Sequence, residues 1–544
     1  MRTFDCSMYD YLRAARAQLS ERSVCWKFYG AVGTQVLLDK HTRALGAYLR
    51  SLGVGKGDNV VLCLGNIPDA IVAFYAINRI GAIANLLHPL LPADRMTRIV
   101  SSMRPKAMFL FDEFYGDYRD ALQAWDAPII FCSACDYLPR LFRPFYGAYV
   151  RSRVREIPYD GARIARYRDA VRFRGQEIDD VAIGGDDIAA YMHSGGTTGE
   201  PRTVAVSNAA LNHVADNVLY SAIGGSATNR DCMLMVLPIF HTFGLGICMH
   251  TSICAGGYPV MVPKFRPASA CATVRRNRIT FISGVPNMYD RMLQVGKFRG
   301  RALRRLRACY CGGDRISSRL SERFYAQMRA AGNPLPLSGG YGLTEAGVTC
   351  INTPDIYREG SLGKPIRGSR FAIVDDAFRF LAAGERGMLL IGGEMLMSGY
   401  WGADPDEGFW TDAQGTRWLI TGDIGYLDAD GYFYFVDRAK RMVKISGVNV
   451  FPQEIENVVS QLPQIRACCA IRCVRESKNA IDLYIVLQDG MCYNQDIEHA
   501  IRDAIGRQLL KYSQPARILP IDDLPLTQIG KVDYRKAEQM IQGR

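Results

Sequence analysis

Between residues 37 and 111, apolar and polar positions alternate in blocks that are typical of helices and strands taken in turn. The pattern predicts helices ending near residue 52 and over 68–80 and 92–102, and strands over 60–64, 82–86 and 107–111. Gly53 and Gly81 follow two of these helices, at the position where a helix C-terminus favours glycine. The strands carry no charge, as strands buried in a parallel sheet require. An α/β architecture is therefore expected.

Further along, short apolar runs are predicted to be strands that end in glycine turns carrying one or two polar groups. These runs end at 236–244, 283–286, 310–314 and 339–345. Ligands of open α/β sheets gather at the carboxyl ends of the strands, so we expect a ligand site where these ends meet. Asp423 follows another apolar run and is suited to accept hydrogen bonds from a ribose diol, although an aspartate in a turn gives the same local pattern.

Residues 194–204 read Ser-Gly-Gly-Thr-Thr-Gly-Glu-Pro-Arg-Thr-Val, which predicts a phosphate-binding loop. Its glycines free the backbone to present successive N–H groups to an anion, and two threonine hydroxyls and Arg202 add donors and positive charge. It is not the common phosphate loop, in which Gly-x-x-x-x-Gly-Lys-Ser/Thr opens into a helix. Because Val204-Ala205-Val206 continues as a β-type run, the loop is predicted to join two strands. A glycine-rich surface turn is the alternative.

The C-terminal residues have their own alternation of elements, which predicts a small separate α+β domain. A helix is expected after Pro452 and another after Asn494, with strands near 467–474, 481–487 and 517–521. The charged stretch 437–441 is the predicted joint, giving an N-terminal domain over 1–437 and a C-terminal domain over 438–544. Lys531 lies in a polar loop of this domain and, taken alone, reads as a surface lysine.

The net charge of the chain is compatible with several kinds of ligand and does not choose between them. A chain of 544 residues exceeds what one core supports, and its net charge of +12 fits a polyanionic ligand, an anionic membrane or nucleic acid. The N-terminus lacks the apolar segment of a secretory signal, so a cytoplasmic protein is expected. The apolar segment 70–91 is interrupted by polar residues, and the sixteen cysteines read as small core residues.

Residues 138–174 combine leucine and aromatic residues with a high density of arginine and few acids. Such a composition suits a segment that lies on an anionic bilayer, which would make the protein peripheral at a membrane. The alternative is a solvated basic face that its aromatic residues pack onto the domain.

Taken together, these stretches resemble the adenylate-forming superfamily, which contains acyl-CoA synthetases, adenylation domains of peptide synthetases and firefly luciferase. The resemblance extends from Tyr9 to Lys531, with the motifs in the family's order. It implies the mixed fold class α/β plus α+β. A large N-terminal domain of packed α/β sheets with a β-rich subdomain would be followed by a small mobile lid that turns about Lys440.

The resemblance also implies roles for matching residues. The β- and γ-phosphates of ATP would bind at Ser194, Gly195, Gly196, Thr197, Thr198, Gly199 and Arg202. The adenine and its surroundings would contact Gly312, Gly313, Asp314, Tyr341 and Gly342, and the ribose Asp423 and Arg438. Thr344 would contact the α-phosphate, Glu345 would hold Mg²⁺, His241 would line the acid pocket and Lys531 would be the catalytic lysine. After lid rotation, Lys444, Ser446 and Gly447 would meet the pantetheine arm of coenzyme A.

The chemistry explains these residue types. A carboxylate is a weak nucleophile that must approach the α-phosphate of an anionic ATP, so the site must neutralise charge and align both reactants. The family usually has lysine where Arg202 stands and glycine where Thr203 stands. Arginine keeps the charge, whereas threonine restricts the backbone and puts the loop's mobility in question.

His241 favours an acid without an α-amino group. Relatives that activate amino acids place an aspartate near this position, and a neutral imidazole does not compensate a buried ammonium. A fatty acid is the first expectation and an aromatic acid the second, with coenzyme A or a carrier-protein phosphopantetheine as the thiol. The rival classes are an adenylate-binding sensor without turnover and a nucleic-acid-binding protein. The second is disfavoured because a binding module does not need Glu345, Asp423 and Lys531 together.

Overall fold

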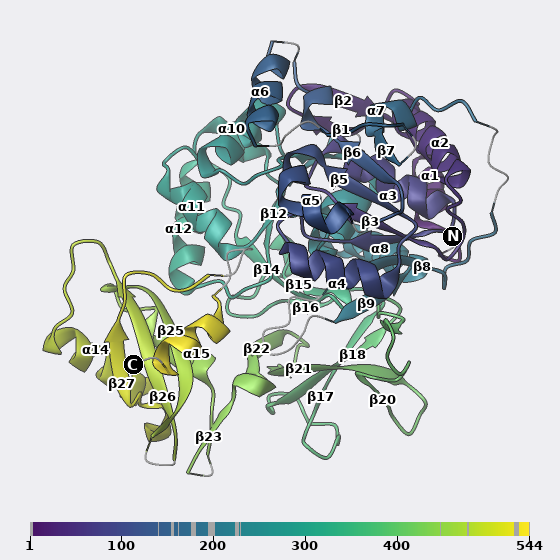
Figure 1. The fold of residues 1–544 in the computed structure, drawn as a ribbon. Helices are drawn as coiled ribbons and strands as arrows, with labels where there is room; N and C mark the ends of the chain where they lie inside the picture. The colour runs from purple at the N-terminus through teal and green to yellow at the C-terminus, as the bar shows by residue number, and fades with distance from the viewer. Residues whose placement is uncertain are drawn as a thin grey trace.

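The structure is a computed structural model of the 544-residue chain. It describes residues 4–123, 125–139, 141–153, 157–161, 163–175, 181–193, 202–223, 228, 230–446, 448–475, 478–526 and 532–542. Figure 1 shows a large N-terminal body of sheets and helices, with a smaller C-terminal part, drawn in yellow-green, beside it.

One large sheet is built from the region in which helices and strands were predicted to alternate. Its strand order is β19-β9-β8-β4-β3-β5-β6-β7. The strands are β3 (Asn59–Cys63), β4 (Ile83–Leu86), β5 (Ala107–Phe111), β6 (Ile129–Cys132), β7 (Ile164–Arg166), β8 (Ile188–His193), β9 (Thr203–Ser207) and β19 (Gly399–Tyr400). Strands β3 to β8 pair in parallel, whereas β9 and β19 close one edge in antiparallel pairing. The predicted parallel α/β arrangement is confirmed.

The three predicted helices of this region are present close to their predicted bounds, over 35–51, 68–79 and 93–103, together with helices that were not predicted. The helices of this region are α1 (Met8–Arg16), α2 (Gln35–Ser51), α3 (Pro68–Arg79), α4 (Ala93–Met103), α5 (Tyr115–Gln123), α6 (Arg143–Arg153) and α7 (Tyr167–Ala170). Gly53 and Gly81 both have positive φ, of 81° and 73°, which glycine adopts without strain. The α3 helix is buried from Pro68 to Asn78, so it needs no polar face.

A second large sheet has the order β16-β15-β14-β13-β12-β10-β11-β1-β2. Its strands are β1 (Val24–Phe28), β2 (Ala31–Thr34), β10 (Cys232–Met235), β11 (Tyr258–Met261), β12 (Phe281–Gly284), β13 (Ala308–Cys311), β14 (Leu337–Leu343), β15 (Gly347–Ile351) and β16 (Lys364–Pro365). The accompanying helices are α8 (Asn208–Ile223), α9 (Ser252–Cys254), α10 (Pro267–Asn277), α11 (Pro286–Gln294) and α12 (Ser318–Ala330). Residues of both sheets, of α3 and of α8 share one apolar core, which fixes the sheets against each other.

The prediction for the run that ends at Gly244 is right for a strand followed by a turn but wrong in missing the helix that comes next. β10 stops at Met235, residues 236–242 turn, and Phe243–Thr251 form a buried π-helix. A Cβ atom on Gly244 would lie 2.0 Å from the carbonyl oxygen of Pro238, so the glycine serves a close backbone approach inside this turn. The predicted turn at Gly339 and Gly340 is also wrong, because β14 continues through both and pairs with β15.

The β-rich subdomain is an antiparallel sheet. It contains β17 (Ser369–Val374), β18 (Gly387–Gly393), β20 (Phe409–Thr411), β21 (Arg417–Leu427) and β22 (Phe433–Arg438). The C-terminal elements follow as β23 (Val443–Ile445), β24 (Val448–Val450), α13 (Pro452–Val459), β25 (Ile465–Arg475), β26 (Lys478–Leu487), α14 (Gln495–Gln508), β27 (Arg517–Pro520) and α15 (Tyr534–Gln542). Every element predicted for this part is present.

The predicted joint lies between two cores. β22 ends at Arg438, and the core of the C-terminal part begins at Val443. Between them, the guanidinium of Arg441 forms ion pairs with Asp437 at 3.4 Å and with Glu456 at 2.7 Å. These ion pairs fix the chain on both sides of the short turn 439–441. The division into domains at residue 438 stays a prediction.

Among the described residues, no helix combines the length and the apolar character needed to cross a bilayer. Most of the apolar segment 70–91 lies in α3 and β4, inside the core of the N-terminal body, whereas Leu90 is 54% exposed.

Candidate active site

A cavity of about 1220 Å³ opens at the carboxyl ends of β10, β12, β13 and β14. Six predicted site residues line it, namely His241, Gly312, Gly313, Tyr341, Gly342 and Thr344. They come from three segments that lie far apart in the sequence. The prediction that a ligand site forms where these strands end is therefore supported by the cavity's position.

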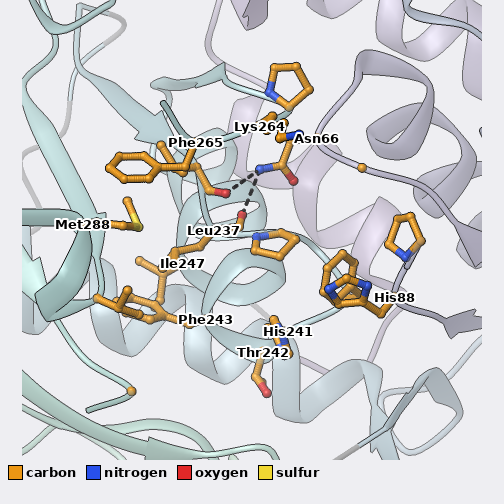
Figure 2. A pocket seen from close by; sticks show the side chains of 18 of the residues that line it. Asn66, His88, Leu237, His241, Thr242, Phe243, Ile247, Lys264, Phe265 and Met288 are labelled. Carbon is orange, nitrogen blue, oxygen red and sulfur yellow. Dashed lines mark hydrogen bonds between the residues drawn. The ribbon is translucent and has the colours of Figure 1, made fainter. Parts of the chain in front are cut away.

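One part of the cavity wall is apolar and shaped by a glycine. Figure 2 shows Leu237, Phe243, Ile247, Phe265 and Met288 around this part. A Cβ atom on Gly312 would lie 3.2 Å from Cε1 of Phe243, so the glycine leaves the phenyl ring room beside β13. Apolar walls with few polar groups suit the hydrocarbon part of a ligand.

The turn that carries His241 is held by Asn66, a residue that the sequence analysis missed. The Asn66 side-chain amide donates hydrogen bonds to the carbonyl oxygens of Val236 and Leu237, both at 3.1 Å (Figure 2). The ring of Phe240 lies between those of His88 and His241, with centroids 4.5 and 4.9 Å away. The turn that carries His241 is thus positioned by Asn66, from the loop between β3 and α3, and by His88, from the segment after β4.

Asp423 contacts Tyr341, which lines one end of the cavity. The Tyr341 hydroxyl donates to Oδ2 of Asp423 at 2.5 Å, and Arg438 Nε lies 3.7 Å from Oδ1. Asp423 is only 3% exposed and lies within β21, which excludes the alternative of a turn aspartate. Burial raises the pKa of Asp423, while the charge of Arg438 and the hydrogen bond from Tyr341 lower it. Each carboxylate oxygen of Asp423 therefore has a partner, Tyr341 from β14 and Arg438 from β22.

Glu345 and Arg202 are linked through Tyr400. The Tyr400 hydroxyl donates to Oε1 of Glu345 at 3.1 Å, and the Arg202 guanidinium lies 4.7 Å above the Tyr400 ring. The pairing of β19 with β9 places Tyr400 opposite Val204, directly after the predicted phosphate loop. Arg202 also forms an ion pair with Glu407 at 2.8 Å. Nothing in the local sequence around Tyr400 or Glu407 indicated these contacts.

The surroundings of Glu345 fit a magnesium ion that arrives with a nucleotide. In the part of the chain that the structure describes, no group of three or more histidine, cysteine or acidic side chains is placed to hold a metal by itself. Magnesium in nucleotide sites is typically held by one or two carboxylates together with substrate phosphates. A single carboxylate beside the end of a phosphate loop provides this donor set.

The residues predicted to cradle the phosphates, Ser194, Gly195, Gly196, Thr197, Thr198 and Gly199, lie outside the described residues. The strands on either side, β8 and β9, pair in antiparallel fashion, so the loop joins two strands as predicted. The Thr203 hydroxyl lies 3.0 Å from Nδ1 of His193, whose Nε2 lies 2.8 Å from Oδ1 of Asn85. Burial and the charge of Arg95 lower the pKa of His193 to about 4, so its imidazole is neutral at neutral pH. Thr203 therefore ties the base of the loop to the neighbouring strand.

In the C-terminal part, the β23–β24 hairpin lies away from the cavity. Lys531 and Gly447 lie outside the described residues. Burial, then the charge of Glu456 and, more weakly, that of Asp314, raise the pKa of Tyr534 at the start of α15. Lys444 and Ser446 are exposed and do not line the cavity, and Figure 1 shows β23 at the outer end of the C-terminal part. The structure does not bring Lys444 and Ser446 together with the other predicted residues.

Comparison with protein families gives two matches along the chain. The model for AMP-binding enzymes matches residues 34–401, and that for the C-terminal domain of AMP-binding enzymes matches residues 454–531. Similar curated proteins include a long-chain-fatty-acid–CoA ligase of Escherichia coli O157:H7, 27% identical over 526 residues, which cover 95% of this chain and 91% of the relative. Feruloyl-CoA synthase of Amycolatopsis sp is 25% identical over 521 residues, covering 95% and 96%.

Similar solved structures include ATP-bound MatB from Rhodopseudomonas palustris, with a TM-score of 0.83, 21% identity and coverage of 98% of this chain and 99% of that one. The anthranilate CoA ligase AuaEII in complex with anthranoyl-AMP gives a TM-score of 0.82 at 22% identity, covering 99% and 98%. At these identities the likeness establishes the fold, which is the mixed α/β architecture with a small C-terminal domain.

Proposed function

Because the chain belongs to the family of AMP-binding enzymes, we propose that it activates a carboxylic acid with ATP and transfers the acyl group to the thiol of coenzyme A. The cavity carries this proposal, since it joins the Tyr341–Asp423 end to an apolar acid pocket at His241. The acid is a fatty acid, supported by the long-chain-fatty-acid–CoA ligases among its relatives and by the apolar walls. An aromatic acid is the second candidate, supported by the feruloyl-CoA synthase relative.

In the first half-reaction, an oxygen of the acid's carboxylate attacks the α-phosphorus of ATP and the bond to pyrophosphate breaks. Asp423 accepts hydrogen bonds from the ribose diol, and Gly312, Gly313, Asp314 and Gly342 border the adenine. Thr344 contacts the α-phosphate, and Lys531 bridges the attacking carboxylate and the α-phosphate as a compact positive charge. Glu345 would hold a magnesium ion, which would supply charge neutralisation at the phosphates.

Arg202 has to change partners for this step. Its present partner, Glu407, is an exposed carboxylate, and such ion pairs contribute little, about 0–1 kcal/mol. A triphosphate carries more negative charge and accepts the planar guanidinium with two oxygens, so it displaces Glu407 from Arg202.

In the second half-reaction, the sulfur of the thiol attacks the acyl carbonyl and the bond to AMP breaks. The C-terminal lid turns about Lys440, withdrawing Lys531 and bringing Lys444, Ser446 and Gly447 to the cavity. The exposed position of Lys444 in the present structure is consistent with the first lid position. A phosphopantetheine on a carrier protein is the alternative thiol, and stimulation of pyrophosphate release by free coenzyme A separates the two.

A hydroxylamine-trapping screen tests the proposal. Purified protein is given MgATP with fatty, aromatic and amino acids in turn, and hydroxamates are measured. Fatty acids are expected to give the highest rate, because the pocket is apolar and has no carboxylate for an ammonium. A preference for an amino acid contradicts the substrate class, and AMP binding without any hydroxamate supports the sensor reading instead.

We further propose that the protein contacts an anionic membrane through residues 138–174, as the composition of this segment suggested. The protein is then released from phosphatidylglycerol vesicles by high salt. Binding is lost when Arg140, Arg143, Arg151, Arg153 and Arg155 become glutamine.

A further inference from the structure

The cavity does not end at the acid pocket. It continues to the surface next to α6, where Leu138, Tyr146 and Tyr149 line it together with Tyr29 and Leu90. Tyr29, Leu90 and Tyr149 are all exposed, so this end of the cavity is an opening.

The α6 helix is attached by one side and exposes an apolar opposite side. Tyr146 packs inward, and its hydroxyl donates to Oδ1 of Asp112 at 3.1 Å. Leu141 and Phe142, just before the helix, and Phe145, in its first turn, are 75%, 56% and 71% exposed. Figure 1 shows α6 projecting from the top of the N-terminal body. Large apolar side chains gathered in this way on a surface mark an interaction site.

The rim of the same opening is positively charged. Lys264, Arg266 and Arg291 line the cavity and are exposed, and they come from the start of α10 and from α11. Arg143 and Arg151 of α6 are exposed as well. Glu113, also on the cavity wall, is outnumbered by these cations. An apolar helix beside several cations matches the boundary between acyl chains and anionic headgroups.

We propose that this opening is the entrance for the acid, and that the exposed side of α6 rests in the surface of an anionic bilayer while the acid enters. This rests on the proposed function as an acid–CoA ligase. A long-chain acid in a bilayer holds its carboxylate at the headgroups, where the rim cations attract it. The carboxylate then moves along the cavity towards His241, and the tail follows it past Tyr149 and Leu138 without crossing water. A second copy of the chain is the less suitable occupant, because two such rims repel each other.

The experiment compares two ways of delivering the acid. The enzyme receives either hexadecanoate held in phosphatidylglycerol vesicles or octanoate dissolved in buffer, with MgATP and coenzyme A. The variants are Leu141→Glu and Phe145→Glu, which change exposed residues outside the cavity. The control is Leu510→Glu, a leucine of the C-terminal part that is 63% exposed. Cosedimentation with vesicles is measured for every protein, and thermal unfolding verifies that each is folded.

Leu141→Glu and Phe145→Glu are expected to lower the rate with vesicle-held hexadecanoate about tenfold or more, to leave octanoate unchanged and to abolish cosedimentation. Leu510→Glu should change none of these. Equal rates of all variants with vesicle-held hexadecanoate overturn the proposal, as does a shift of the free protein to dimers that the α6 variants abolish. If the wild-type protein makes neither thioester, the proposed function has failed instead, so the two failures are distinguishable.

Discussion

Replacing Tyr341 by phenylalanine tests the nucleotide end of the site with the smallest possible change. The ring is retained, because it packs edge-on against Phe371 and Phe433 with centroids 6.1 and 5.2 Å away. Only the hydroxyl that donates to Asp423 at 2.5 Å is lost. Since burial already raises the pKa of Asp423 and this hydrogen bond lowers it, the variant's Asp423 holds its proton to a higher pH.

The expected loss follows from the charge of the acceptor. A hydrogen bond to an ionised group contributes about 1.5–3 kcal/mol, which corresponds to about a 10- to 150-fold lower kcat/KM for ATP. The loss is greatest at low pH, where the protonated Asp423 no longer accepts both hydrogen bonds of the ribose diol. The acid side of the pH profile should therefore move to higher pH.

The assay is acid-dependent pyrophosphate release, measured against ATP concentration across a range of pH. The matched control is Tyr289→Phe, which removes a buried hydroxyl that donates to the carbonyl oxygens of Ile282 and Tyr310 at 3.1 and 2.8 Å. It should lower stability by about 1 kcal/mol without changing the ATP profile. An unmoved acid side in Tyr341→Phe, or an equal movement in Tyr289→Phe, refutes the reasoning.

Three further predictions concern the lid and the attachment of α6. Lys531→Ala should abolish adenylate formation and spare thioester formation from supplied acyl-adenylate, and equal loss of both half-reactions would contradict the role of Lys531. Gly447→Leu should slow coenzyme A transfer more than pyrophosphate release, because a side chain would fill the pantetheine path, and a variant that still makes acyl-CoA at the normal rate argues against that path. Burial raises the pKa of Asp112 to about 6, against hydrogen bonds from Ser133 and Tyr146, so its ionisation destabilises the folded state as pH rises from about 4 to about 6. Asp112→Asn should then raise the unfolding free energy by up to about 3 kcal/mol at about pH 8 and leave it unchanged at low pH, which thermal unfolding at both pH values measures.

The parts of the fold that local patterns determine were predictable from the sequence. The strand over 107–111 has the predicted bounds, and Gly53 and Gly81 have the positive φ expected after a helix. The π-helix after residue 242 was not predicted, because an apolar run gives the same signal for a buried helix and a buried strand. The close approach of Gly244 to Pro238 decides between them, and only the folded structure shows it.

Six of the predicted site residues line one cavity, but the contacts between site residues were not predicted. The hydrogen bond from Tyr341 to Asp423 joins residues 82 positions apart, and no local pattern indicates such a pair. Tyr400 was missed for the same reason, since its place beside Glu345 depends on the pairing of β19 with β9. Residues 138–174 were read as one surface, either membrane-facing or packed. The structure divides them, because Tyr146 packs inward while Phe145 next to it is exposed.

The central claim is that the acid's own oxygen attacks the α-phosphorus of ATP. The most direct test uses a fatty acid labelled with ¹⁸O in both carboxylate oxygens, given to the purified enzyme with MgATP and coenzyme A. The account predicts that each turnover leaves one ¹⁸O atom in AMP and none in pyrophosphate, because the bond between the acyl carbon and that oxygen breaks when the thiol attacks. Unlabelled AMP, or label in inorganic phosphate accompanied by ADP, would contradict it.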